Sequence, residues 1–235
     1  MPNEVLLILM TILLYSSVVL FYRFFNVLGL YCWTVLSTIS ANIEVLILIN
    51  AFGLEQTLGN ILFATTFLVT DILSEIASRQ EATRAVNIGI VTSLMFIIIS
   101  QSWLLYTPNG SDWAFPHIQA IFSNTPRVML SGLIVYAIVQ RFDVWLYHRW
   151  WQWSAKFSGD RRRYLWLRNN GSTLISQLLN ALLFTFGAFY GTYSLSTLLS
   201  ITWASYVIFI FTSLADTPAV YAARWLKEHH HVKNI

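Results

Sequence analysis

The sequence predicts an all-α fold, a polytopic helical membrane bundle with about seven transmembrane helices. Of its 235 residues, 56% are hydrophobic and only 11% are charged. Soluble domains carry roughly 25% charged residues, so a water-soluble fold of this length would lack polar surface. Apolar segments of spanning length also alternate with short polar links along the whole chain. These observations favour a membrane protein over a soluble domain.

The expected spans are apolar segments near the roughly 20 residues needed to cross a hydrocarbon core about 30 Å thick. The first lacks a basic leading region and a clean cleavage site, so we interpret it as a helix rather than a signal peptide. We expect one membrane domain over residues 1–235, with this N-terminal helix, a core over 29–215 and a tail over 216–235. The spans are residues 4–24, 29–52, 59–77, 86–106, 125–147, 171–191 and 194–215.

Basic residues predict the orientation of the helices. They gather after the third span, between the fifth and sixth, and in the tail, whereas the opposite links GLEQTLG and TPNGSDWAFPHIQAIFSNTP contain none. Loops rich in Lys and Arg stay in the cytosol, so we expect an outside N-terminus and a cytosolic C-terminus. The residues concerned are Arg79, Arg84, Arg149, Lys156, Arg161, Arg162, Arg163, Arg168, Arg224, Lys227 and Lys233.

The sequence offers little for enzymatic chemistry. Cys32 is the single cysteine, which excludes a disulfide framework and a multi-cysteine metal site. No G-x-S-x-G elbow and no phosphate-binding loop occur, and His148 lies only at the edge of a span. The net charge of +3 is too small to suggest nucleic acid. We therefore expect no enzyme, no cofactor and no metal. We expect the lipid bilayer as a partner, and a homodimer stays open.

Charged side chains inside the predicted spans are the first candidates for function. Insertion scales put a charge at the bilayer centre at roughly 2.5–3.5 kcal/mol. Asp71 and Glu75 share one helix face, which Arg79 continues, so Glu75 and Arg79 are expected to pair. Asp71 lies one turn deeper and needs a basic residue from another helix, a proton or a ligand. Glu44 lies in the middle of the second predicted span, between two asparagines.

Two further pairs of polar residues have the same spacing on different helices. Gln140 and Asp143 lie on the fifth span, and Gln177 and Asn180 on the sixth. Such pairs can serve interhelical hydrogen bonding, worth about 0.6 kcal/mol each in membranes, or can line a site between helices. Together with Asp71 they favour a site. The outer loop over 107–125, with its aromatic residues, predicts either an interfacial aromatic belt or a lid.

Several motifs occur in a fixed order along the chain. The most specific are TFLVTDILSE at 66–75 and LWLRNNGST at 165–173. With them the chain resembles the queuosine precursor transporters, a vitamin-uptake-like membrane family, over roughly residues 26–215, and its first helix looks like an extra helix before a six-helix core. The accompanying matches are Ala41-Asn42, Phe52-Gly53, Thr83-Arg84, Pro126-Arg127, Gln140-x-x-Asp143 and Gln177-x-x-Asn180.

The resemblance implies import of 7-cyano-7-deazaguanine or 7-aminomethyl-7-deazaguanine across a bacterial cytoplasmic membrane, by secondary or facilitated transport. A guanine-like base offers N–H donors to a carboxylate, a carbonyl to an amide and a flat ring to aromatic faces. The candidate substrate-binding residues are Asp71, Gln140, Asp143, Gln177 and Asn180; Glu75, Glu44 and Arg168 are expected to support them or carry a proton.

The chain departs from the family pattern at three places. The family usually has Asp at the position of Asn180, Pro at Ala64 and Tyr-Gly at Ala77-Ser78. Losing an acid at position 180 favours a neutral base or a different coupling. Three alternatives remain open: the substrate-binding subunit of an energy-coupling-factor vitamin importer, a transporter of another planar purine-like solute, and a membrane scaffold without substrate.

Overall fold

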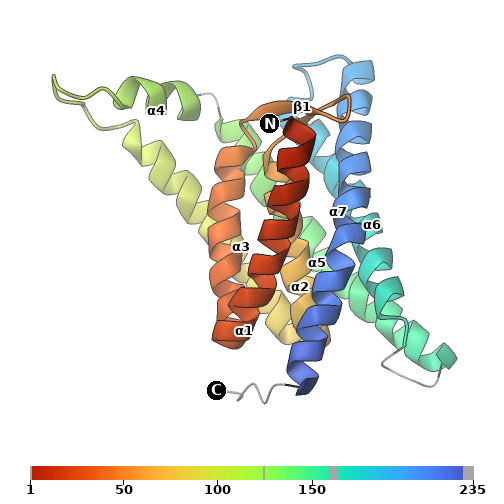
Figure 1. The fold of residues 1–235 in the computed structure, drawn as a ribbon. Coiled ribbons are helices and arrows are strands. Elements are labelled where there is room, and N and C mark those ends of the chain that lie inside the picture. Colours follow the sequence, from red (N-terminus) through yellow and green to blue (C-terminus); the bar gives the residue numbers. More distant parts are fainter. Residues whose placement is uncertain (1, 124, 159–162, 230–235) are drawn as a thin grey trace.

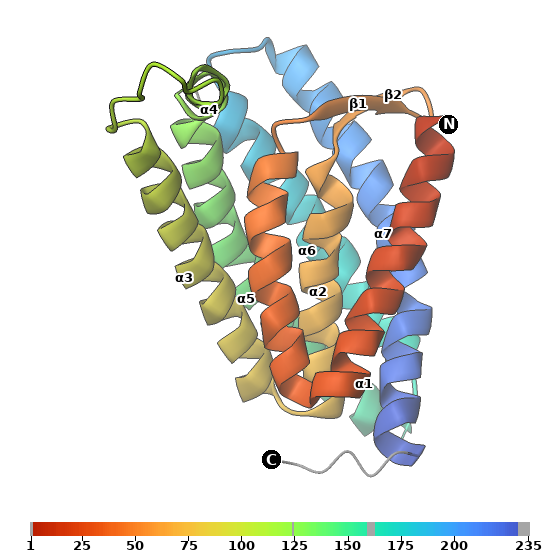
Figure 2. The ribbon, with the colours of Figure 1, turned by 60° about the vertical axis from the view of Figure 1, so that its left-hand side comes forward.

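The computed structural model describes residues 2–123, 125–158 and 163–229 (Figure 1). Long helices form one bundle, and a small β-hairpin covers one end of it (Figure 2). The elements are α1 (Asn3–Glu44), β1 (Leu48–Ala51), β2 (Leu54–Thr57), α2 (Gly59–Ile76), α3 (Arg79–Trp103), α4 (Phe115–Phe122), α5 (Pro126–Ser158), α6 (Leu165–Phe189) and α7 (Leu195–His229).

Helix α1 consists of two helices that meet at Asn26. Asn26 has a positive φ of 56° and a non-helical ψ of −143°, a conformation that Asn tolerates better than most residues. The first half runs away from the β-hairpin and the second half returns to it (Figure 2). Among the described residues, six helices are long and apolar enough to cross a membrane, with α1 counted once. Because α1 supplies two spans, the prediction of about seven transmembrane helices is confirmed.

The β-hairpin corrects the predicted end of the second span. That span was expected to reach residue 52, but the helix ends at Glu44 and the chain turns into strands β1 and β2. Phe52 and Gly53 both have positive φ, 54° and 72°, which suits a tight two-residue hairpin turn. Apolar residues here therefore pair as strands instead of extending the helix.

The N-terminal end of α1 holds this hairpin in place. Asn3 donates its side-chain amide to the carbonyl oxygen of Asn50 at 2.9 Å. The backbone N–H of Phe52 donates to Glu4 Oε1 at 3.1 Å. Two residues of the first turn thus bind the hairpin through its backbone.

Other helix boundaries also differ from the expected spans. Helix α3 begins earlier than predicted because Ser78 caps it, accepting a hydrogen bond from the backbone N–H of Glu81. Arg79 and Arg84 therefore belong to the helix instead of a loop. Helix α5 continues to Ser158, and α7 continues to His229, so the predicted tail is helical to that point. Arg161, Arg162 and Lys233 lie outside the described residues.

Helix α2 is the centre of the bundle. In its 18-residue apolar stretch, 83% of the residues are buried, against at most 44% in the corresponding stretch of any other spanning helix that the structure describes. Its Leu68 and Ile72 belong to the largest hydrophobic cluster, which also includes residues of α1, α3, α5, α6 and α7. The outer surfaces of the surrounding helices are apolar, with Ile98 and Phe211 more than half exposed. This is the arrangement expected of helices that face lipid.

Gly29 allows the two halves of α1 to approach. A Cβ atom at this position would overlap the backbone carbonyl group of Phe21. We expect Gly29→Ala to destabilise the protein by about 1–3 kcal/mol, the usual range for overpacking. The thermal unfolding midpoint of the detergent-purified protein measures this.

Gly110 provides the matched control, because a Cβ atom there meets nothing within 4 Å. Gly110→Ala should unfold at the same temperature as the original protein. An unchanged midpoint for Gly29→Ala would contradict the close packing of the α1 halves.

Candidate functional site

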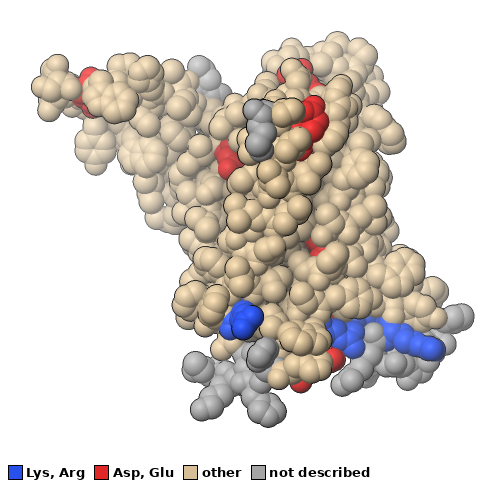
Figure 3. Space-filling view, in the orientation of Figure 1, with Lys and Arg blue, Asp and Glu red and all other residues tan. Residues whose placement is uncertain are grey.

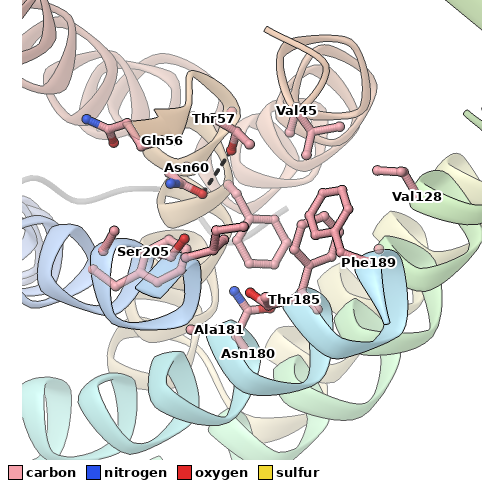
Figure 4. Close-up of a pocket in the computed structure, with 18 of the residues that line it drawn as sticks. Val45, Gln56, Thr57, Asn60, Val128, Asn180, Ala181, Thr185, Phe189 and Ser205 are labelled. Atoms are coloured by element: carbon pink, nitrogen blue, oxygen red, sulfur yellow. Dashed lines mark hydrogen bonds between the residues drawn. The ribbon is translucent and has the colours of Figure 1, made fainter. Parts of the chain in front are cut away.

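A cavity of about 420 Å³ lies inside the bundle, below the β-hairpin (Figure 4). The second half of α1 and parts of α2, α3, α5, α6 and α7 form its walls, and residues of β1 and β2 form its roof. Small-molecule pockets measure roughly 300–1,000 Å³. The cavity is therefore large enough for a small solute.

Aromatic side chains line much of the cavity. Phe63 of α2 and Tyr136 of α5 meet edge to face, with ring centroids 6.0 Å apart. Phe184 and Phe189 of α6 and Phe209 of α7 also border the cavity. Such rings offer flat apolar faces on which a planar ligand can stack.

Amide side chains supply the polar part of the lining. Asn60 and Asn180 reach the cavity from different walls (Figure 4). Asn60 Oδ1 accepts a hydrogen bond from Thr57 at 3.1 Å, but its Nδ2 has no partner among the described residues. Gln56 of the roof is 3% exposed, and both polar atoms of its side chain lack a described partner. Because buried unpaired amides cost free energy, a ligand that pairs with them would bind favourably.

Of the five predicted substrate-binding residues, Asn180 is the one that borders the cavity. Asn180 Nδ2 donates to Gln177 Oε1 at 3.4 Å, one helical turn below it. Gln140 is fully buried and donates at 2.7 Å to Thr66 Oγ1, which borders the cavity. Gln140 and Gln177 therefore lie behind the lining residues and can orient them.

Asp71 and Asp143 lie deeper and do not border the cavity. Both are 0% exposed. Asp71 Oδ2 accepts a hydrogen bond from Thr173 of α6 at 2.9 Å. The predicted polar residues of α2, α5 and α6 thus lie close together inside the bundle, and the acids lie further from the hairpin than the amides.

Glu75 forms a buried ion pair with Arg168, which corrects the expected pairing with Arg79. Arg168 donates to Glu75 from Nε at 2.9 Å and from Nη2 at 2.7 Å. The hydroxyl of Tyr147 donates to the same carboxylate at 2.9 Å, and Arg224 adds an ion pair at 3.3 Å. Helix α2 ends at Ile76 and a new helix begins at Arg79, so Arg79 does not continue the face of α2.

This ion-pair cluster of Glu75, Arg168, Tyr147 and Arg224 lies at the end of the bundle away from the hairpin. Asn60 at the cavity and Glu75 at the cluster are separated along α2 by about 22 Å, at 1.5 Å per residue. The Arg168 guanidinium also lies 4.6 Å from the centre of the Trp151 ring. The cluster joins α2, α5, α6 and α7 at that end.

Two residues need separate correction. Glu44 was expected in the middle of a span, but it is the last residue of α1 and only partly buried. Asp216 of α7 was not predicted as a candidate, although it is 1% exposed and accepts a hydrogen bond from Asn169 at 2.7 Å. The predicted seventh span ended one residue before it. Helical periodicity continued through residues 216–229 would have placed Asp216 inside the bundle.

Within the described part of the chain, no group of three or more His, Cys, Asp and Glu side chains could hold a metal ion. The fold and the cavity define a class: a multi-pass membrane protein with an internal chamber for a small solute.

Comparisons with known proteins give the family. The family model described as "Putative vitamin uptake transporter" matches residues 57–223. A "Probable queuosine precursor transporter" of Bacillus subtilis (strain 168) is 37% identical over 224 residues, which cover 95% of this chain and 96% of the relative. The chain belongs to this vitamin uptake transporter family. No solved structure matches it.

The buried ion pair should be costly to break. Glu75→Gln leaves the Arg168 guanidinium without its counter-charge, and breaking such a pair costs about 3–5 kcal/mol. We expect a marked loss of protein from the membrane fraction and a lower thermal midpoint.

Glu228→Gln removes the acid of an ion pair one turn apart on α7, with Glu228 40% exposed. Pairs of this kind contribute about 0.3–0.5 kcal/mol, so this control should be nearly neutral. Equal effects of the two substitutions would mean that the Glu75 pair is not buried as described.

Proposed function

We propose that the protein imports a queuosine precursor through this cavity, by secondary or facilitated transport across a bacterial cytoplasmic membrane. The observation that carries the proposal is the lining itself: aromatic faces and unpaired buried amides in a chamber of about 420 Å³. The Bacillus subtilis relative is named for the same class of solute. The precursors in question are 7-cyano-7-deazaguanine and 7-aminomethyl-7-deazaguanine.

The lining suits a guanine-like base. Such a base carries both hydrogen-bond donors and an acceptor on its edge, and an amide side chain offers both kinds of group. Asn180, Asn60 and Gln56 would bind the edge of the base, with Phe63 and Tyr136 beside its ring. In this proposal Gln140 and Gln177 orient the lining, and Asp71 and Asp143 do not contact the base.

The charge distribution supports a cavity that opens to the outside. On the face shown in Figure 3, Lys and Arg lie at the end of the bundle opposite the β-hairpin, where the described part of α7 ends. Arg127 lies at the other end, where it donates to the carbonyl oxygens of Gly187 and Tyr190 at the end of α6. By the positive-inside rule this end is cytosolic. The N-terminus and the cavity would then lie towards the outside, and the ion-pair cluster would close the cytosolic end. Release into the cell would require that cluster to separate, as alternating access demands.

Uptake in living cells tests the proposal. Bacteria that cannot synthesise the precursor would be supplied with each deazaguanine, and the queuosine content of their transfer RNA would be measured. The protein should restore queuosine with at least one base. Asn180→Leu should lower uptake by about 5- to 140-fold, because losing one buried hydrogen-bond partner costs about 1–3 kcal/mol.

Asn87→Leu is the matched control, since Asn87 is exposed and lies away from the cavity lining. Failure of both bases, with the protein present in the membrane, would refute the proposed substrate. Restoration only together with an ATPase partner would favour the energy-coupling-factor alternative.

The charge of the lining predicts which base is preferred. Glu55 is the one acidic residue among the described lining residues, and it is exposed at the roof. A buried ammonium group needs a counter-charge, so the neutral 7-cyano base should compete for uptake about 10-fold better than the aminomethyl base.

Asn180→Asp restores the acid that the resembling family usually carries and should shift this preference towards the aminomethyl base. Competition by both unlabelled bases, measured at equal protein level, gives the ratio. An unchanged ratio would mean that the side chain at position 180 does not select between the two bases.

A further inference from the structure

Three acidic residues are buried together below the cavity. Asp71 of α2 and Asp143 of α5 are 0% exposed, and Asp216 of α7 is 1% exposed. Each interacts electrostatically with at least one of the others. These carboxyl groups come from three different helices, so their proximity is a property of the folded bundle.

The described ion pairs leave these carboxyl groups uncompensated. Among the described residues, the ion pairs involve Glu75, Glu81 or Glu228, and Arg168 is bound to Glu75. Asp71 and Asp216 each accept one hydrogen bond, from Thr173 and Asn169. Neither oxygen of Asp143 has a hydrogen-bond partner among the described residues. Three ionised carboxylates in such a place would each lack a counter-charge, at a cost of several kcal/mol per ion.

Unpaired polar atoms beside the acids point to a missing proton. Asn169 Oδ1 is an acceptor without a described donor, although its Nδ2 is bound to Asp216. Ser176 is 0% exposed, and its hydroxyl lies beside Asp143 without completing a hydrogen bond. Asn169 Oδ1 can only accept, whereas a protonated carboxyl group is a donor, so a proton on one of the acids would supply the donor that Asn169 lacks.

A line of polar side chains connects the acids to the cavity. On α6 they lie at spacings of four, three, one and three residues, which keeps them on one helical face. The line runs from Asn169 beside Asp216 to Asn180 in the cavity wall. Its members are Asn169, Thr173, Ser176, Gln177 and Asn180. On α5, Tyr136 at the cavity and Gln140 lead to Asp143 in the same way.

We propose that Asp71, Asp143 and Asp216 form a proton-binding site that couples import of the base to proton entry. This rests on the proposed function. A proton from hydronium in the outward cavity would bond to a carboxylate oxygen, most directly that of Asp143, and leave water behind. The same O–H bond would break when the site opens to the cytosol. A metal ion is a poorer occupant, because the described acids do not converge as metal ligands.

Other ionisable groups around the site are accounted for. Glu75 lies on α2 beyond Asp71 but is bound by Arg168 of α6 and Tyr147 of α5. Tyr15 of α1 lies near Asp216 and donates its hydroxyl to the carbonyl oxygen of Thr212. In this proposal the three aspartates bind the transported proton, and Glu75, Arg168 and Glu44 take no part in proton binding or release.

Purified protein in liposomes tests the coupling with 7-cyano-7-deazaguanine as the probe. Counterflow, in which unlabelled base inside exchanges for labelled base outside, measures transport without a driving gradient. A proton gradient directed inward then measures coupling. For one proton per base, a gradient of about one pH unit should support accumulation of up to about 10-fold. Asp143→Asn should keep counterflow and abolish this accumulation.

Asp112→Asn is the matched control, because this exposed outer-loop acid only accepts backbone hydrogen bonds from Ala114 and Phe115. It should retain both activities. Asp216→Asn, which can still accept from Asn169, replaces Asp143→Asn if the latter fails to fold.

The outcomes separate the two proposals. Absence of counterflow by the original protein would refute the proposed function. Counterflow without accumulation under a proton gradient, or accumulation driven by sodium instead, would overturn the proton site and leave the proposed function standing. Loss of counterflow in folded Asp143→Asn would also overturn it, since Asp143 would then serve the base.

Discussion

The structure depends on one constraint: polar side chains in a lipid-embedded bundle must find partners among themselves. Helix α2 shows how this is met, since it is the most buried helix and yet carries Thr66, Asp71 and Glu75. Each finds a partner on a different level: Gln140 of α5, Thr173 of α6 and Arg168 of α6. The surrounding helices are therefore positioned along α2 so that these polar partners meet. Their remaining apolar surfaces face lipid.

The same constraint divides the interior into three levels. Amides and aromatic rings border the cavity below the hairpin, three aspartates lie beneath it, and an ion pair closes the far end. The ion pair is the most completely satisfied level and joins four helices. The cavity and the aspartates are less satisfied, since side-chain atoms of Gln56 and Asn60, and of Asp71 and Asp143, have no hydrogen-bond partner among the described residues. Paired charges thus lie at one end of the bundle, and atoms without a described partner lie at the aspartates and at the cavity.

Much of the fold was predictable because composition and the length of apolar segments determine membrane spans. The ends of those spans were less predictable, since a serine cap started α3 early and a two-residue turn converted residues 48–57 into strands. Partners across helices were beyond the reach of spacing along one helix. Glu75 was expected to pair with Arg79 but pairs with Arg168, 93 residues away. Asp216 was overlooked because the apolar pattern weakens just before it.

The hydrogen bonds that Asn3 and Glu4 form with the hairpin have a practical and a mechanical consequence. The roof of the cavity is held by the first turn of the chain, so the hairpin and the first half of α1 form one mechanical unit. Any outward movement of the roof would have to tilt that helix or break both bonds. A purification tag joined at the N-terminus would bear on this unit, whereas the described end of α7 lies at the other end of the bundle (Figure 1).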